Sequence, residues 1–300
     1  MRKAAAVLFI SIIILLSLSG CRGDKNEILM KYGLLIGGAA DGESIGAAAE
    51  FLDDNISEVD RKTATEMVIE YREYLYNYII QNKDKTIIQE LGVYLDEKTG
   101  RIDEEKIKGS AHKPYYDLIK SGSLMITIYE GMPVLRIDHN MLTEKYGEYI
   151  SDSTMGLYSL CETLIEEPTT ENAGLNVDWN ELLRRTYEAE RLIKKYPEDE
   201  ATAEEANWIY TSHINSVLMG ATNTPIFSYE TKEFSASAQK AYRAFILSEP
   251  DSVLTWVLNE YFDYLDSIDY TLDFNDSTAS KIFFDTCDWL VSEAEKRVKE

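Results

Sequence analysis

The chain has 300 residues, of which 45% are hydrophobic and 28% are charged, with 16 Gly and 6 Pro. This composition excludes a collagen-like or wholly disordered chain and suffices for a large core. The formal net charge of −23 repels phosphate backbones, so we expect no nucleic-acid partner. Three Cys and three His supply little material for a zinc site, and we expect no metal and no cofactor.

Residues 1–20 have the three parts of an export signal. Met1-Arg2-Lys3 is basic, and the apolar run from Ala4 to Leu18 is shorter than the roughly 20 residues that a membrane-spanning helix needs. The run ends in Leu18-Ser19-Gly20-Cys21, which is an aliphatic residue, two small residues and a Cys. This tetrapeptide resembles the lipobox of bacterial lipoprotein signal peptides.

The resemblance implies cleavage between Gly20 and Cys21 and attachment of diacylglycerol to the thiol of Cys21. The mature protein would then be held by acyl chains on the extracytoplasmic face of a bacterial cell membrane. Because anionic lipids repel a polyanion, the lipid rather than the protein surface would provide the attachment. The alternative is that the run from Ile12 to Leu16 belongs to a buried helix or to an uncleaved anchor.

Residues 21–42 are first polar and then rich in Gly and Ala, which favours a lipidated, flexible tether. The next segments show apolar residues at three- and four-residue spacing, and Asp60 stands where an N-cap is expected. In the mixed N-terminal part, residues 43–168, helices are predicted at about 43–52, 60–80, 103–108, 114–120, 140–149 and 152–166.

The hydrophobic period changes from helical to alternating between residues 123 and 138. Residues 124–129 and 134–137 form two β-like runs across Glu130-Gly131-Met132, which predicts one small β-hairpin. The loop at 168–176 separates this mixed part from a helical part at 177–300. The predicted fold class is therefore mainly α, built from antiparallel helical hairpins with one small β-hairpin.

Two segments of the C-terminal part align with each other. Residues 188–197 and 241–250 each end an amphipathic helix at a Pro, and a second amphipathic helix follows a short acidic turn. Over residues 178–267 this pattern resembles the tetratricopeptide (TPR) helical-hairpin family, which implies a protein- or peptide-binding scaffold without catalytic residues. Helices are predicted at about 178–196, 199–219, 235–248, 251–267 and 277–298.

The TPR resemblance is partial. The signature W-x2-L-G-x2-Y is missing from both copies, and Pro197 and Pro250 are 53 positions apart, whereas TPR repeats recur about every 34 residues. The segment from Gly220 to Glu233 would have to be an insertion. The alternative is a pair of ordinary helical hairpins whose first helices stop at Pro.

Cys161 and Cys287 lie on apolar stripes of their predicted helices. Free Cys is among the most buried residue types, so this placement favours two core thiols. A disulfide between them is the alternative, since the extracytoplasmic compartment permits one.

The three histidines, His112, His139 and His213, are widely separated in the sequence. Only Asp138-His139, together with Glu144 or Glu148, could make a metal or acid–base cluster. No H-E-x-x-H or His-x-His spacing is present, and a chain this acidic places carboxylates near any His by chance, which argues against a functional cluster.

Tyrosine is abundant, with 20 residues, and four of them, Tyr71, Tyr74, Tyr76 and Tyr78, share one predicted helix. Three of these are spaced two apart and cannot all face one core. They are either exposed, and available to a protein or a glycan, or they form a Tyr-rich edge of the core.

We expect a lipid-anchored extracytoplasmic protein that acts as a non-enzymatic scaffold for another envelope protein or peptide. The alternative is a cell-envelope hydrolase that acts on cell-wall glycan or peptide through paired carboxylates around Asp138 and Glu144. An open surface lined by Tyr and acidic residues would favour the scaffold. Two buried carboxylates facing a cleft, with one pKa raised, would favour the hydrolase.

Overall fold

The computed structural model describes residues 22–81, 85–96 and 98–300. Across these ranges the chain forms thirteen α-helices and three two-stranded antiparallel sheets, which confirms the mainly α fold class. The predicted cleavage and lipidation residues, Gly20 and Cys21, lie outside the described residues. Of the helices that are described, none combines the length and the apolar character that a membrane span requires.

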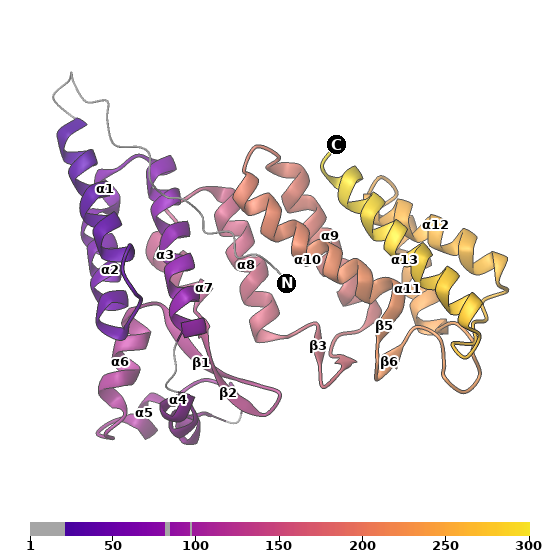
Figure 1. Ribbon diagram of the computed structural model, residues 1–300, viewed down its shortest axis with the longest axis horizontal. Coiled ribbons are helices and arrows are strands. Elements are labelled where there is room, and N and C mark those ends of the chain that lie inside the picture. Colours follow the sequence, from indigo (N-terminus) through magenta and orange to yellow (C-terminus); the bar gives the residue numbers. More distant parts are fainter. Residues whose placement is uncertain (1–21, 82–84, 97) are drawn as a thin grey trace.

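The elements follow one another along the elongated molecule in Figure 1. The N-terminal helices are α1 (Arg22–Ile36), α2 (Gly42–Asn55), α3 (Arg61–Gln81), α4 (Lys85–Leu91), α5 (Glu104–Ile107), α6 (Lys113–Ser121), α7 (His139–Tyr146) and α8 (Asp152–Glu166). The C-terminal helices are α9 (Trp179–Lys195), α10 (Glu200–Met219), α11 (Ala236–Ser248), α12 (Val253–Ser267) and α13 (Ser277–Val298). The strands are β1 (Leu124–Tyr129), β2 (Met132–Ile137), β3 (Thr170–Glu171), β4 (Gly174–Leu175), β5 (Gly220–Ala221) and β6 (Thr224–Pro225).

Helix α1 occupies most of the segment that the sequence favoured as a tether, so that prediction was wrong. It packs on α2 and α3, and the hydroxyl of Tyr32, which is only 1% exposed, donates to the carbonyl of Met67 at 2.7 Å. The apolar residues of α1 are not confined to one face, since Met30 and Leu34 remain exposed. An amphipathic pattern is therefore weak in this helix, and a tertiary contact through Tyr32 holds it.

The predicted β-hairpin is confirmed. Strand β1 pairs with β2 in the register Leu124↔Ile137 to Tyr129↔Met132. The two turn residues, Glu130 and Gly131, both have positive φ, at 49° and 76°. A tight hairpin turn needs this because it matches the twist of the strands. The hairpin packs on α3, α4 and α6.

The C-terminal helices stack as expected for helical hairpins. Helices α9 and α10 pack along each other on either side of the turn at Pro197, and α11 and α12 are joined at Pro250. Helix α11 also lies against α9, whereas α13 lies against α10 and α12 (Figure 1). Side-chain caps start these helices, as Asp178 does for α9 and Ser252 for α12.

Two small hairpins, β3–β4 and β5–β6, occupy the segments predicted as loops. They lie side by side and are joined by Asn223. Its backbone N–H donates to the carbonyl of Ala173 at 2.8 Å, and its side-chain amide donates to the carbonyl of Asn172 at 2.7 Å. Each hairpin links the end of one helix to the start of another. Both therefore sit at the end of the helical stack that is opposite to Pro197 and Pro250 (Figure 1).

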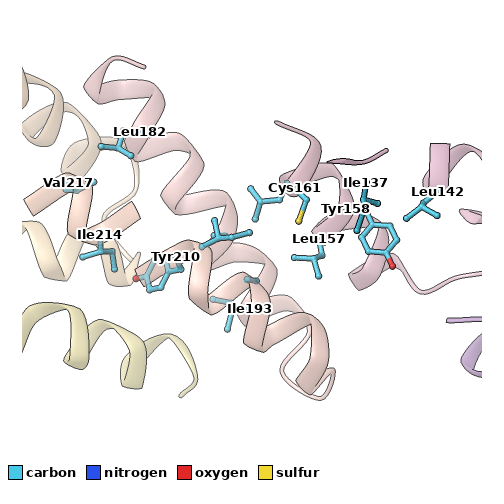
Figure 2. Packing of buried hydrophobic residues seen from close by; sticks show 14 of the residues in the cluster. Ile137, Leu142, Leu157, Tyr158, Cys161, Leu182, Ile193, Tyr210, Ile214 and Val217 are labelled. Carbon is cyan, nitrogen blue, oxygen red and sulfur yellow. The ribbon is translucent and has the colours of Figure 1, made fainter. Parts of the chain in front are cut away.

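The buried apolar side chains form one cluster that continues across the predicted boundary at 168–176. Figure 2 shows buried side chains following one another from Leu157 and Cys161 of α8 through Ile193 of α9 to Tyr210 of α10. Cys161 and Cys287 are both buried free thiols, so no disulfide joins them. Burial raises the pKa of each thiol to about 12, which keeps both protonated and unreactive.

The tyrosines of α3 form an edge of the core. Tyr71, Tyr74 and Tyr78 are 0%, 4% and 6% exposed, whereas Tyr76 is 59% exposed. The hydroxyl of Tyr71 donates to the carbonyl of Gly122, and that of Tyr74 donates to Ser44. Buried hydroxyls with partners of this kind are structural, which leaves only Tyr76 of the four on the surface.

Candidate functional site

A cleft of about 730 Å³ lies between α8, the C-terminal half of α9 and the turn that joins α11 to α12. We call it the α8–α9 cleft and define it by Leu160, Tyr187, Arg191, Lys194, Tyr196 and Glu249. A second hollow, of about 370 Å³, shares Tyr187 and Glu249 with it and continues between α9 and α11. Together they follow α9 along most of its length.

The floor of the cleft depends on a close approach of two helices. A Cβ atom at Gly156 would lie 2.7 Å from Cδ1 of Leu192, so glycine lets α8 lie directly against α9. At the end of α9, Asp199 caps α10 and also accepts a hydrogen bond from the hydroxyl of Ser153 in α8. These contacts set the distance between the two walls.

Glu190 holds in place the third wall of the cleft, which is the turn that joins α11 to α12. Its side chain is 1% exposed, and its carboxylate accepts the backbone N–H groups of Val253 and Leu254 at 2.8 and 2.9 Å. The ammonium group of Lys194 donates to the same carboxylate at 2.9 Å. A carboxylate at the first turn of α12 is favourable because free N–H groups and the helix dipole converge there. Sequence reasoning missed Glu190, although it lies on the same stripe as Ala189 and Ile193.

The rim of the cleft carries aromatic rings beside charged groups. Tyr187 packs edge-on against Phe245, with ring centroids 5.7 Å apart, and a hydrogen bond to Glu249 raises the pKa of its hydroxyl. The guanidinium of Arg191 lies 5.9 Å from the Tyr187 ring. The ammonium group of Lys195 lies 5.0 Å from the ring of Tyr196.

Both signs of charge face this cleft. Its basic residues are Arg191, Lys194 and Lys195, and its acidic residues are Asp152, Glu188, Glu190, Glu249 and Asp251. Such a lining can hydrogen-bond to the amide groups and the mixed side chains of an extended segment, while the tyrosines supply apolar area. The cleft thus matches the open surface, lined by Tyr and acidic residues, that would favour a scaffold.

The cluster that Asp138 and His139 could make with Glu144 or Glu148 does not form. Glu144 and Glu148 are exposed, whereas His139 is 5% exposed. The imidazole accepts a hydrogen bond on Nε2 from Nε of Arg72 at 3.1 Å, so its proton is on Nδ1. Burial, aided by Arg72, lowers the pKa of His139 to about 3. Within the described ranges, no three His, Cys, Asp or Glu residues group as a metal site would require.

The other two histidines have separate structural partners. His112 lies between the hydroxyl of Tyr94 and the carboxylate of Glu90. His213 is buried, and its Nε2 lies 3.1 Å from the hydroxyl of Thr169.

Asp138 meets a different carboxylate from the one the sequence suggested. It caps α7 by accepting the N–H of Met141, and burial together with Asp138 raises the pKa of Glu162. Arg101 lies between the two acids, 3.0 Å from Glu162 and 3.8 Å from Asp138. The backbone N–H of His139 also donates to Glu162 at 3.2 Å. Sequence reasoning missed Glu162, which follows Cys161 on the buried side of α8.

The two carboxylates do not share one cleft. A hollow of about 200 Å³ is lined by Asp138 and Arg101, and Glu162 is not part of its wall. Comparison with known protein families, with curated proteins and with solved structures finds no match for this chain.

Proposed function

We propose that the protein is a lipid-anchored extracytoplasmic scaffold whose α8–α9 cleft binds an extended segment of another envelope protein or peptide. The observation that carries this proposal is the open cleft along α9, in which Tyr187 and Tyr196 stand beside groups of both charges. Tyrosine gives contact area at low entropic cost and keeps a hydroxyl for hydrogen bonding. Stacked helical hairpins on either side supply rigid walls, which limits the ordering cost of binding.

The position of α1 bears on the anchor. Because α1 begins at Arg22, a lipid on Cys21 would be joined to a packed helix without an intervening tether. The acyl chains would have to supply the attachment, since removal of Arg2 and Lys3 makes the strongly acidic chain more negative still. The body would then lie close to the membrane surface, with the α8–α9 cleft farther along the molecule.

The anchor is tested by metabolic labelling with a fatty acid in wild type and in Cys21→Ala. We expect labelled wild-type protein in the membrane fraction and unlabelled Cys21→Ala protein that still carries residues 1–20. Recovery of unlabelled wild-type protein with its first twenty residues attached would contradict the lipid anchor and the location.

The cleft is tested by placing a photo-crosslinking amino acid at Tyr187 and, as the control, at the exposed Asp285 of α13. We expect a specific partner to be captured from membranes at Tyr187 and not at Asp285. Tyr187→Ala and Lys194→Glu should then each weaken binding of the purified partner by about ten-fold, or about 1.4 kcal/mol. Equal capture at both positions, or unchanged affinity of both variants, would exclude the cleft as the binding site.

The hydrolase remains a second candidate because of one observation, the raised pKa of Glu162 beside Asp138. The pKa of a carboxyl group that serves as a general acid is raised in the same direction. Incubation of the purified protein with peptidoglycan fragments tests this role. A hydrolase would release products that Glu162→Gln no longer releases, whereas a scaffold would release none in either form.

A further inference from the structure

We infer that a second groove, between the β1–β2 hairpin and α10, binds an acidic sugar by its carboxylate and one face of its ring. We call it the Arg136 groove. It has a volume of about 400 Å³ and is defined by Tyr129, Arg136, Pro168, Thr170, Trp208 and Ser212. It lies outside the α8–α9 cleft, so this inference goes beyond the proposed peptide site.

Arg136 is the first observation. Its side chain is half-buried, and Nε has no hydrogen-bond partner among the described residues. Burial lowers the pKa of this guanidinium, and the one neighbouring group that opposes the change is Tyr129. Other half-buried arginines are paired, as Arg72 is with Glu205 and Arg101 with Glu162.

The lack of a partner for Arg136 is informative because the chain is so acidic. With 53 acidic residues against 30 basic ones, a partly desolvated guanidinium that has no carboxylate partner in the described part of the chain is unusual. Desolvation without compensation costs free energy, which a bound carboxylate would recover through charge-assisted, bidentate hydrogen bonds. The Tyr129 ring, 5.0 Å from the guanidinium carbon, holds the group on one side of the groove.

Trp208 is the second observation. Its side chain is 69% exposed on α10, whereas Trp179, in the core, is 8% exposed. A large exposed indole loses free energy by contact with water and gains it by covering a flat apolar surface. The C–H face of a sugar ring has that shape. Because Trp208 lines the same groove as Arg136, a stacking surface lies beside a carboxylate-binding group.

The polar lining distinguishes a sugar from an aromatic acid. Thr170 and Ser212 are exposed hydroxyl-bearing residues of the groove, and His213, which is 5% exposed, also lines it with an Nδ1 that has no partner among the described residues. A sugar presents hydroxyls around its ring edge that can bond to these groups. An aromatic carboxylate would leave them without a ligand. The volume suits one or two sugar rings.

The negative field of the whole molecule sets the expected strength. It opposes the approach of an anion from a distance but is screened beyond about 10 Å at 0.1 M salt, whereas a contact inside the groove is screened much less. We therefore expect binding of the order of 1 mM, or about −4 kcal/mol, for a single ring.

The test is a titration of the detergent-solubilised full-length protein with methyl glucuronide, followed by calorimetry and by tryptophan fluorescence, whose ligand-dependent change should be absent from Trp208→Ala. Methyl glucoside and benzoate are the comparison ligands, since each lacks one half of the proposed recognition. We expect the glucuronide to bind about ten-fold more tightly than either. Absence of glucuronide binding up to about 10 mM, or benzoate binding of equal strength, would overturn the assignment.

Variants separate this site from the rest of the molecule. Trp208→Ala removes an exposed indole and Arg136→Gln removes the charge. Each should weaken binding of the glucuronide by about ten-fold. The matched controls are Trp289→Ala, an exposed indole on α13, and Arg184→Gln, an exposed guanidinium on α9. These controls and Tyr187→Ala should bind normally, so failure of the peptide site would leave this result unchanged. Unchanged affinity in Trp208→Ala would contradict the inference even if Arg136→Gln did not fold.

Discussion

Arg185 and Glu190 of α9 are each 1% exposed, yet each has partners that account for its charge. Arg185 donates to the carboxylates of Glu181 and Glu167 and to the carbonyl of Glu167. Glu190 accepts two N–H groups of α12 and the ammonium group of Lys194. An unpaired buried charge costs several kcal/mol, so these contacts tie α9 to Glu167 and to the start of α12.

Replacement of Glu190 should therefore reduce stability much more than replacement of its neighbour Glu188, whose side chain is 43% exposed. Glu190→Ala leaves the N–H groups of Val253 and Leu254 without their acceptor, and we expect the free energy of unfolding to fall by about 3 kcal/mol. Glu188→Ala should change it by less than about 0.5 kcal/mol. Urea denaturation of both variants measures the difference, and equal losses would show that the Glu190 contacts contribute little.

The buried histidines predict a dependence of stability on pH. Burial, with Arg72, lowers the pKa of His139 to about 3, and burial, with Arg185, lowers that of His213 to about 4. In the unfolded chain both should titrate near 6.5. As the pH falls from 6.5 toward 4, the unfolded state takes up protons that the folded state does not, so stability decreases.

Each histidine should contribute about 1.4 kcal/mol per pH unit in this window. We expect His139→Gln to reduce the slope of unfolding free energy against pH by about that amount, and His213→Gln to do the same. Chemical denaturation at several pH values between 4.5 and 6.5 measures the slopes. Slopes identical to wild type in both variants would mean that the histidines are protonated in the folded protein.

At the scale of elements, the β5–β6 hairpin turns the chain sharply at the end of α10. Gly220 has φ of +72°, and a Cβ atom there would lie 2.3 Å from the carbonyl oxygen of Thr224. No other residue fits such a position without strain. The hairpin lies against β3–β4, so this glycine contributes to the spacing of the whole helical stack.

Gly220→Ala should lower the free energy of unfolding by about 2 kcal/mol, because both φ and the close carbonyl oppose a side chain. Gly38→Ala is the matched control, since nothing lies within 4 Å of a Cβ atom there. It should be neutral or slightly stabilising. Thermal unfolding of the two variants compares them, and an equal midpoint would show that the turn adjusts.

At the scale of the whole molecule, polar contacts reinforce the continuous core between the N-terminal and C-terminal parts. Arg72 of α3 pairs with Glu205 of α10, with Nη1 2.7 Å from Oε2, and its guanidinium lies 5.6 Å from the Tyr158 ring. The side chains are 19% and 32% exposed, so solvent screens this pair only in part. The two parts are therefore expected to unfold together.

We predict a single cooperative unfolding transition and a coupling energy of about 1–2 kcal/mol between Arg72 and Glu205 in a double-mutant cycle with Arg72→Met and Glu205→Gln. The exposed pair Lys281–Asp285 on α13 is the control, for which a coupling below about 0.5 kcal/mol is expected. Two separate transitions, or equal coupling in both pairs, would contradict this view of the molecule.

Local patterns in the sequence determined the mainly α class, the β1–β2 hairpin and most helix bounds, because periodicity, capping and proline act within a few residues. They also carry the prediction of a lipid anchor at Cys21. Only the tertiary structure decided that α1 is a packed helix, that Cys161 and Cys287 stay apart, and that Asp138 meets Glu162. These outcomes depend on side chains that are distant in sequence, and no local pattern encodes which of them come into contact.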